Sequence, residues 1–325
     1  MIDLRCSFAG LALANPIIIS SCGLTSRAEN NAAFESAGAA AVVIKSLFEE
    51  SIVRESDMLL HGAEHGEASD YLQGYMRVER LREYLDVIKC SKQLCSIPII
   101  ASIAARSADE WVAFAEAIEQ VGADALELNI MSLASSRNYL YGSYEQMHID
   151  ILSAVKRCCH IPIIVKLGAN LTNPLSLANS LKGHGADGVV MFNRPYQIDI
   201  DIEKMAFSSA KVISHCGDLV NPLRWVTLTS SAIKTLPLAL SGGVHNGVAV
   251  VKALLAGASA VEVCSAIYRD GNVWIRTALE YVEEWCRRHD FDSVEEFRGH
   301  LSVTDAERVD HLERMQFMRY FGSWK

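Results

Sequence analysis

Short apolar runs recur along the whole chain, and each is introduced by one of two signatures. Four runs follow a Gly-Ala pair, at Gly38-Ala39, Gly122-Ala123, Gly185-Ala186 and Gly257-Ala258. Four others follow a proline, at Pro16, Pro98, Pro162 and Pro237. The runs are rich in Ile and Val and are not split by polar residues at period two, which is typical of strands buried on both faces. The pattern predicts eight parallel strands.

Segments of helical periodicity follow most of the runs. Clear examples cover residues 79–94, 107–121 and 144–158. Parallel neighbouring strands need a helical crossover of this kind between them. Because the two signatures strictly alternate, the sequence predicts eight strand–helix units that close into a (β/α)8 barrel, a TIM barrel; a doubly wound sheet is the alternative.

The chain contains no linker and no low-complexity stretch, so a single domain over residues 1–325 is expected. Residues 1–14 predict a small hairpin that closes the bottom of the barrel, with Gly10 at or near its turn. Residues 292–325 predict one or two short helices packed outside the barrel. The fold is therefore expected to be a barrel with one small addition at each end of the chain.

The length in excess of a typical barrel lies mainly in three insertions, at residues 47–78, 131–143 and 194–222. Each insertion follows the C-terminal end of an even-numbered strand. Barrel enzymes build their active sites on that face. The insertions therefore predict a functional site there.

Charge and cysteine content exclude several classes of function. The formal net charge is −9 and no Lys/Arg-rich tract is present, which argues against nucleic acid as a partner. No run is apolar enough to span a membrane, and Asp3 and Arg5 stand where a signal peptide would be apolar, so a cytoplasmic protein is expected. Nine cysteines without a CxxC pair predict free thiols rather than a disulfide framework or a metal site. His61 and His65 have metal-ligand spacing, but no third ligand accompanies them, so no metal is expected.

A glycine pair follows the seventh predicted strand. Segment 241–244 is Ser-Gly-Gly-Val, and Asn246 then begins a helix predicted to end at Leu255. Cys264 and Ser265 occupy the matching place after the eighth strand. Two glycines let the backbone approach a ligand closely, and the loops after strands seven and eight commonly bind phosphate in these barrels. The sequence predicts a phosphate site there, although two glycines can also serve only to turn the chain.

Polar side chains end four of the predicted strands. Lys45 and Lys166 end the second and fifth, and Asn129 and Asn193 end the fourth and sixth. A lysine in a buried strand is costly unless its ammonium reaches a polar site or extends into solvent. We expect these side chains to meet at the barrel mouth around an anionic or electron-rich small molecule.

Several of these motifs occur in the order found in one known enzyme family. Asn-Pro opens the first strand, Lys-Ser follows the second, Glu-Leu-Asn ends the fourth, Val-Lys-Leu lies in the fifth and Ser-Gly-Gly-Val follows the seventh. With this order, residues 15–271 resemble the dihydroorotate dehydrogenase family, and Glu-Phe-Arg-Gly at 296–299 is similar to its C-terminal piece. The resemblance implies an FMN-dependent dehydrogenase acting on CH–CH bonds, which oxidises dihydroorotate to orotate in pyrimidine biosynthesis. FMN would lie across the barrel mouth.

The resemblance also implies a set of site residues. Ser132, on the loop after strand four, would remove a substrate proton while hydride passes to the flavin. Lys166 would stabilise the anionic reduced flavin. Asn129, Asn193 and Arg194 would bind the substrate. The implied flavin contacts are Ser21, Lys45, Ser46, Asn129, Lys166, Ser241, Gly242, Gly243, Cys264 and Ser265.

The substrate loops depart from the family pattern and leave alternatives open. Ala134 replaces an asparagine, and segment 47–78 lacks the family's Asn-rich stretch. One alternative is another small carboxylate-bearing substrate, paired with Arg194 or Arg224. Others are a flavin-binding subunit of a redox complex, and a flavin-free isomerase or lyase that forms a Schiff base on a strand-end lysine. A homodimer is one assembly that the sequence allows.

Overall fold

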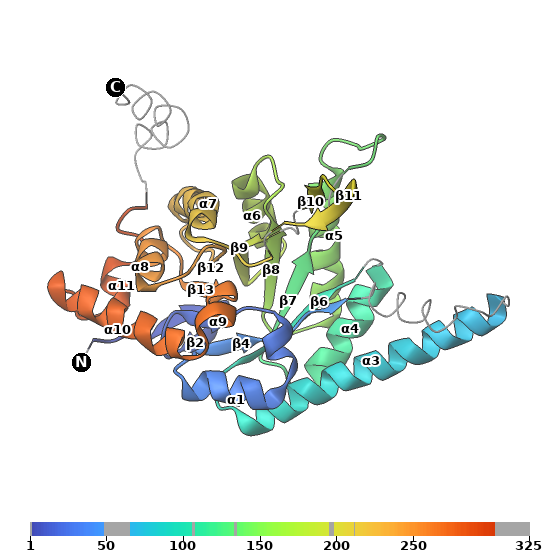
Figure 1. The fold of residues 1–325 in the computed structure, drawn as a ribbon, viewed down its shortest axis with the longest axis horizontal. Coiled ribbons are helices and arrows are strands. Elements are labelled where there is room, and N and C mark those ends of the chain that lie inside the picture. Colours follow the sequence, from blue (N-terminus) through green and yellow to red (C-terminus); the bar gives the residue numbers. More distant parts are fainter. Residues whose placement is uncertain are drawn as a thin grey trace.

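The computed structural model describes residues 2–48, 66–105, 108–132, 135–194, 198–210 and 212–302. His61, His65, Ala134 and the chain after residue 302 lie outside these ranges. Within them, the chain forms a parallel barrel with helices around it (Figure 1). No helix in the described ranges is both long enough and apolar enough to cross a lipid bilayer.

Eight parallel strands close the barrel, as the two signatures predict. In chain order they are β3 (Ile17–Ile19), β4 (Ala41–Val43), β6 (Ile99–Ala104), β7 (Ala125–Ile130), β8 (Ile163–Gly168), β9 (Gly188–Asn193), β12 (Leu238–Ser241) and β13 (Ala260–Val263). Each strand pairs with the next, and β13 pairs with β3, with Val261 opposite Ile17. The (β/α)8 fold is confirmed.

Helices connect these strands and cover the barrel from outside (Figure 1). They are α1 (Ala28–Ser36), α3 (Gly66–Leu94), α4 (Ala108–Gln120), α5 (Ser143–Cys158), α6 (Pro174–Gly183), α7 (Val220–Ala232), α8 (Gly247–Leu255), α9 (Ser265–Asp270), α10 (Val273–Arg288) and α11 (Val294–Phe297), with short 3-10 turns η1 (Gly23–Ser26) and η2 (Cys216–Leu219). The helix predicted to begin at Asn246 is α8. Asn246 caps it, because its Oδ1 accepts the Ala249 amide at 3.0 Å.

The four Gly-Ala signatures are helix stops. Each of the four glycines has a positive φ, from +89° to +106°. The alanine that follows donates its amide to the carbonyl five residues earlier, as Ala39 does to Phe34 and Ala258 to Ala253, both at 3.0 Å. This Schellman geometry favours glycine at the left-handed position. The signature therefore ends one helix and directs the chain into the next strand.

The four prolines act at the opposite point, where a strand enters the sheet. Proline has no amide hydrogen to donate, but its carbonyl can still join the ladder. Pro16 accepts the Val261 amide at 2.8 Å, and Pro162 accepts the Leu126 amide at 2.9 Å. Each proline thus starts a strand while its carbonyl binds the neighbouring strand.

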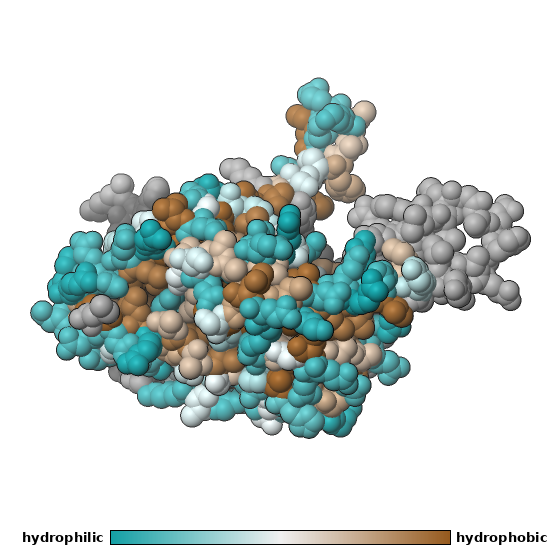
Figure 2. All heavy atoms as spheres, turned by 90° about the horizontal axis from the view of Figure 1, so that it is seen from below, coloured by the Kyte–Doolittle hydropathy of each residue, from teal (hydrophilic) through white to brown (hydrophobic). Residues whose placement is uncertain are grey.

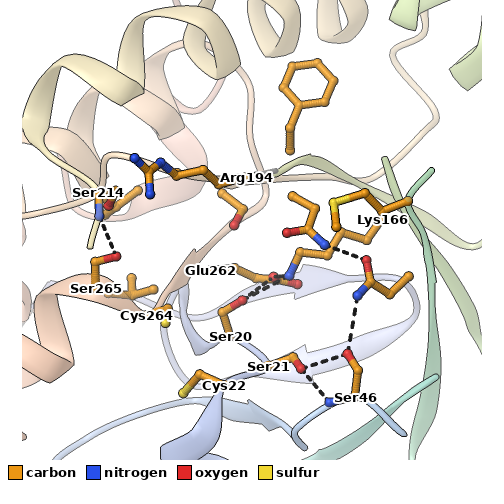
Figure 3. A pocket seen from close by; sticks show the side chains of 18 of the residues that line it. Ser20, Ser21, Cys22, Ser46, Lys166, Arg194, Ser214, Glu262, Cys264 and Ser265 are labelled. Atoms are coloured by element: carbon orange, nitrogen blue, oxygen red, sulfur yellow. Dashed lines mark hydrogen bonds and ion pairs between the residues drawn. The ribbon is translucent and has the colours of Figure 1, made fainter. Parts of the chain in front are cut away.

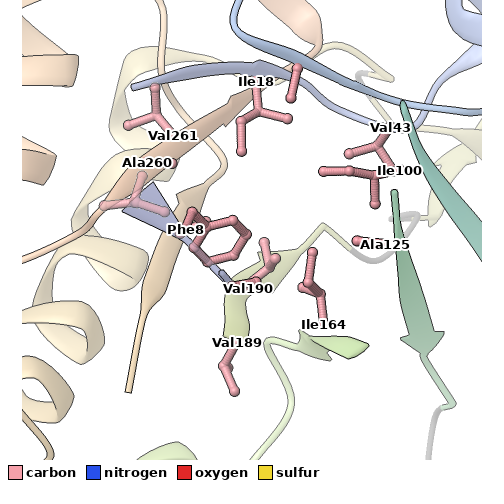
Figure 4. Packing of buried hydrophobic residues seen from close by; sticks show 14 of the residues in the cluster. Phe8, Ile18, Val43, Ile100, Ala125, Ile164, Val189, Val190, Ala260 and Val261 are labelled. Atoms are coloured by element: carbon pink, nitrogen blue, oxygen red, sulfur yellow. The ribbon is translucent and has the colours of Figure 1, made fainter. Parts of the chain in front are cut away.

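The N-terminal hairpin closes one end of the barrel. Strands β1 (Cys6–Phe8) and β2 (Leu11–Leu13) pair antiparallel, and Gly10, at φ +79°, lies in their turn. Phe8 is fully buried among apolar side chains of the barrel strands (Figure 4). A Cβ on Gly188, the first residue of β9, would lie 3.1 Å from the Phe8 ring. The hairpin therefore fills the N-terminal end of the barrel.

The insertions contribute small elements at the opposite end. The first begins with β5 (Leu47–Phe48), which pairs with β6, and the third forms an antiparallel hairpin from β10 (Ile198–Asp201) and β11 (Ala206–Ser209). This hairpin projects from the barrel (Figure 1), and its Ile198, Ile200 and Phe207 are exposed. On the face shown in Figure 2, hydrophilic and hydrophobic residues are interspersed. Scattered apolar groups of this kind are ordinary on protein surfaces.

Candidate functional site

A cavity of about 340 Å³ opens among the C-terminal ends of the strands (Figure 3). Most of the predicted site residues share its wall, although they come from both ends of the chain. Those that line it are Ser21, Lys45, Ser46, Asn129, Lys166, Asn193, Arg194, Ser241, Gly242, Gly243, Cys264 and Ser265. Closure of the barrel brings them together, because the carboxyl ends of all eight strands meet on one face.

Lys166 and Glu262 lie together at the floor of the cavity (Figure 3), and Glu127 lies behind them. The Lys166 ammonium lies 2.5 Å from Glu262 Oε2 on β13 and 3.7 Å from Glu127 Oε2 on β7. Ser20 Oγ accepts a hydrogen bond from Lys166 Nζ at 3.0 Å and donates one to Glu262 Oε2 at 2.9 Å. All three charged residues are at most 4% exposed. We call Glu127, Lys166 and Glu262 the buried triad.

The buried triad holds two carboxyl groups against one ammonium. Burial, reinforced by repulsion from Glu262, raises the pKa of Glu127 to about 8 despite the attraction of Lys166. Burial alone would lower the pKa of Lys166, but the attraction of both glutamates outweighs it and raises that pKa. At neutral pH, Glu127 is therefore protonated, and Lys166 is charged and forms an ion pair with Glu262.

A chain of hydroxyl groups leads from the buried triad to the cavity wall. Ser102 Oγ donates a hydrogen bond to Glu127 Oε1 at 3.0 Å. The hydroxyls of Ser102 and Ser46 lie 2.8 Å apart, and those of Ser46 and Ser21 lie 2.9 Å apart. We call Ser102, Ser46 and Ser21 the serine chain. Glu127 and Ser102 are fully buried, whereas Ser46 and Ser21 line the cavity.

Two asparagine side chains continue this network along the rim. Asn193 Nδ2 donates to Asn129 Oδ1 at 2.6 Å, and Asn129 Nδ2 donates to Ser46 Oγ at 3.4 Å. Asn129 is opposite Lys166 in the β7–β8 register, so both side chains reach the same level of the barrel. The asparagines are thereby held in fixed orientations beside the ammonium. A ring system with carbonyl and N–H groups would find both donors and acceptors here.

Backbone forms the opposite edge of the cavity, after β12 and β13. Gly242 and Gly243 have φ values of +102° and +73°. A Cβ on Gly243 would lie 2.7 Å from the carbonyl carbon of Asp218, so the glycine loop packs directly on η2. Ser265 Oγ accepts the Ser214 amide at 3.0 Å and retains its own hydrogen for donation. This edge combines close backbone approach with a free hydroxyl hydrogen, which suits an anionic oxygen.

The Cys264 thiol lies beside a second thiol of the cavity wall, Cys22 (Figure 3). Hydrogen bonding to Cys264 and to the Leu24 and Thr25 amides lowers the pKa of Cys22, against the effect of burial. The same pairing, together with burial, raises the pKa of Cys264. Cys264 is therefore a neutral thiol at this edge of the cavity.

The two remaining cations of the predicted site are placed differently from Lys166. Lys45 lies two residues beyond β4 and is exposed, although it lines the cavity. Arg194 donates from Nη1 to the Val212 carbonyl at 2.9 Å, and its Nε lies 3.4 Å from Asp218 Oδ2. Arg194 therefore ties the third insertion to the rim of the cavity.

Comparison with known proteins agrees with the order of the motifs. The sequence profile of the dihydroorotate dehydrogenase family matches residues 70–284. The chain belongs to the dihydroorotate dehydrogenase family. This is a family of oxidoreductases that act on CH–CH bonds.

Similar relatives carry the name dihydroorotate dehydrogenase B (NAD(+)), catalytic subunit. The protein of Bacillus mycoides (strain KBAB4) is 31% identical over 213 residues, which cover 62% of this chain and 67% of the relative. The protein of Thermoplasma volcanium is 26% identical over 311 residues, which cover 92% of this chain and 98% of the relative. The protein of Lachnoclostridium phytofermentans is 28% identical over 205 residues, covering 62% and 68% of the two chains.

Ser132 is the one predicted site residue of this dihydroorotate dehydrogenase family member that does not line the cavity. It is exposed, on the loop between β7 and α5. Its amide donates to the Tyr144 hydroxyl at 3.3 Å, and its carbonyl accepts from Asn170 Nδ2 at 3.0 Å. Met131, the residue before it, does line the cavity. The loop thus places Ser132 just outside the cavity wall.

The residues that sequence reasoning missed at or behind the cavity of this family member include Ser20, Ser102, Glu127 and Glu262. The two glutamates carry a signal that could have identified them. Each lies inside a buried apolar run, where an ionisable side chain needs a partner. The partner itself could not be named from the sequence, because it depends on which strands face one another across the barrel.

Proposed function

We propose that this chain is an FMN-dependent oxidoreductase that oxidises dihydroorotate to orotate by transferring hydride to the flavin. One observation carries the proposal. The buried ammonium of Lys166, the Asn129 amide and the Gly242-Gly243 backbone, each predicted separately, surround one cavity. Membership of the dihydroorotate dehydrogenase family supports the same conclusion.

The donor set of the cavity fits FMN. Gly242, Gly243 and the Ser265 hydroxyl would hold the phosphate, since positive φ and close packing leave backbone in place of side chain there. Lys166 and Asn129 would bind the polar edge of the isoalloxazine ring system. The remaining contacts in this proposal are Ser21, Lys45, Ser46, Ser241 and Cys264. When bound, FMN would supply the acceptor for a hydride, that is, for two electrons and one proton.

The residues of this chain would supply orientation and proton transfer. Asn193 and Arg194 lie on the side of the cavity that adjoins the third insertion, where they would bind the substrate's amide and carboxylate groups. Ser132 would accept the proton from the carbon next to the one that loses hydride. A serine hydroxyl needs activation for this step. Asn170 holds the Ser132 backbone in place through its carbonyl.

The purified protein is expected to be yellow, and anaerobic addition of dihydroorotate is expected to bleach its flavin absorption. The measurement is an absorption spectrum followed by anaerobic titration. If the protein contains stoichiometric flavin and dihydroorotate leaves that flavin oxidised, dihydroorotate is rejected as the substrate, whereas FMN is retained as the cofactor. A protein that remains colourless after incubation with FMN would reject both.

Replacing Ser132 by alanine is expected to slow flavin reduction by about a hundredfold, the usual size of a general-base contribution. The flavin spectrum and FMN affinity should not change, because Ser132 lies outside the cavity wall. Stopped-flow reduction measures the rate. Ser136→Ala, on the same exposed loop, is the matched control and should reduce at the parental rate. Equal rates in Ser132→Ala and the parent would remove Ser132 from the mechanism.

A second candidate substrate is another small carboxylate-bearing acid. A further cavity of about 360 Å³ adjoins the first at Gly242, and it is lined by both Arg194 and Arg224. Two guanidinium groups on one cavity favour an anionic ligand. If dihydroorotate fails to bleach the flavin, unsaturated and cyclic carboxylic acids are the compounds to titrate next.

A further inference from the structure

We propose that the serine chain is a proton relay, which connects the wall of the cavity to the carboxyl group of Glu127 and lets that carboxyl store one proton. The contacts that carry the proposal are continuous from the cavity wall to Glu127. They run through the hydroxyls of Ser21, Ser46 and Ser102, with steps of 2.9 Å, 2.8 Å and 3.0 Å. These distances are those of ordinary hydroxyl hydrogen bonds.

The chemistry of the chain suits proton movement. Each hydroxyl can donate one hydrogen and accept others, so a proton arriving at Ser21 can displace the hydroxyl hydrogens in sequence. Ser102 already donates toward Glu127 Oε1, which is the orientation needed for delivery to the carboxylate. In the net step, a hydronium ion in the cavity loses one O–H bond, one O–H bond forms on Glu127, and each serine gives and receives one proton. The step needs no oxidant, reductant or other co-reactant.

Glu127 has surroundings that allow it to hold and to release a proton. Lys166 on β8 and Glu262 on β13 face it with opposite charges, and Tyr84 of α3 lies nearby, with its hydroxyl donating to the Ser102 carbonyl at 2.8 Å. Burial makes the protonated carboxyl the stable form at neutral pH. The Lys166 ammonium limits the penalty when the carboxylate forms. The Glu127 carboxyl is therefore protonated at neutral pH and can still release its proton.

The relay gives a proton from the cavity a destination other than solvent. Glu127 is fully buried, and the serine chain links its carboxyl to the cavity through continuous hydrogen bonds. What the proton is used for rests on the proposed function, in which charge in the cavity changes when the flavin is reduced. The existence of the relay does not depend on it, since the hydroxyls and the carboxyl belong to this chain.

Infrared spectroscopy tests the relay on the protein as purified. Below the pKa of Glu127, the spectrum should contain the C=O stretching band of a protonated buried carboxyl, which Glu127→Gln should remove. After rapid mixing into D₂O, the band should shift as the proton exchanges. Ser102→Ala should slow this exchange about tenfold or more, because it removes the hydroxyl that contacts Glu127. Ser102→Thr keeps a hydroxyl and should restore the parental rate.

A buried serine outside the relay provides the matched control. Ser91 is fully buried and accepts a hydrogen bond from Asn31 at 2.9 Å, so Ser91→Ala should cost similar stability while leaving the exchange rate unchanged. Exchange in Ser102→Ala as fast as in the parent, or a carboxyl band that survives Glu127→Gln, would overturn the relay.

Flavin content, read from the absorption spectra of the same samples, separates the two proposals. Colourless protein with slow exchange in Ser102→Ala would reject the proposed function and retain the relay. If the protein is yellow and Ser102→Ala exchanges at the parental rate, the proposed function is retained and the relay is rejected.

Discussion

Replacing Lys166 by methionine is expected to lower the free energy of unfolding by about 3–5 kcal/mol, the usual cost of removing one partner from a buried ion pair. Lys166 is the only cation within the buried triad, and its ammonium contacts both Glu262 and the Ser20 hydroxyl. Methionine has similar length and leaves little cavity, so the loss measures charge rather than packing. Urea denaturation of the parent and the variant gives the difference.

The loss of unfolding free energy in Lys166→Met should become larger as the pH rises. Without the ammonium, the attraction that holds down the pKa of Glu127 is lost, so the folded state keeps this carboxyl neutral up to a higher pH, whereas in the unfolded state it ionises near its ordinary pKa of about 4.3. Above that pH the folded state binds more protons than the unfolded state, so the free energy of unfolding falls with pH. Adding Glu262→Gln removes the excess carboxyl and should recover part of the loss. A deficit below about 1 kcal/mol that is independent of pH would contradict the buried triad as a charged unit.

Replacing Gly243 by alanine is expected to destabilise the protein by about 4 kcal/mol or more, which is at the extreme of single substitutions. The new Cβ would overlap the Leu219 amide nitrogen and lie 2.7 Å from the Asp218 carbonyl carbon. Backbone atoms cannot move aside as a flexible side chain would. Relief requires the glycine loop to separate from η2, so FMN affinity should fall as well. Thermal unfolding and flavin titration measure the two effects.

Gly242→Ala is the matched control for this prediction. Gly242 also has a positive φ, but its nearest neighbour for a Cβ is Pro222 Cγ at 3.6 Å, an ordinary contact. The substitution should therefore cost only the backbone strain, about 1–3 kcal/mol. Equal effects at the two positions would show that φ alone, and not close packing of the loop, requires glycine here.

The sequence was sufficient for the barrel because the decisive signals are local. A glycine that ends a helix, as at Gly38 or Gly257, is specified by the left-handed turn that it must adopt. A proline that starts a strand, as at Pro16, is specified by its missing amide. Eight such signals in strict alternation leave few folds other than a barrel, and every strand lies where its signature predicts.

The site could be predicted only in part, because it depends on contacts across the barrel. Lys166, Asn129 and Gly243 could be found, since each is an unusual residue at a strand end. The partners of Lys166 could not, because Glu262 faces it from a strand that is distant in sequence and adjacent only after the barrel closes. The serine chain has the same origin. Its three serines come from separate segments of the chain. None carries a distinguishing signal in the sequence, and their hydroxyls come into contact only when the barrel closes.

A crystal structure of the protein grown with FMN would show directly whether the flavin binds in this cavity. We expect one flavin in the cavity, with its phosphate against Gly242, Gly243 and Ser265 and its ring system against Lys166 and Asn129. An empty cavity at saturating FMN, or flavin bound at another place on the chain, would contradict this expectation.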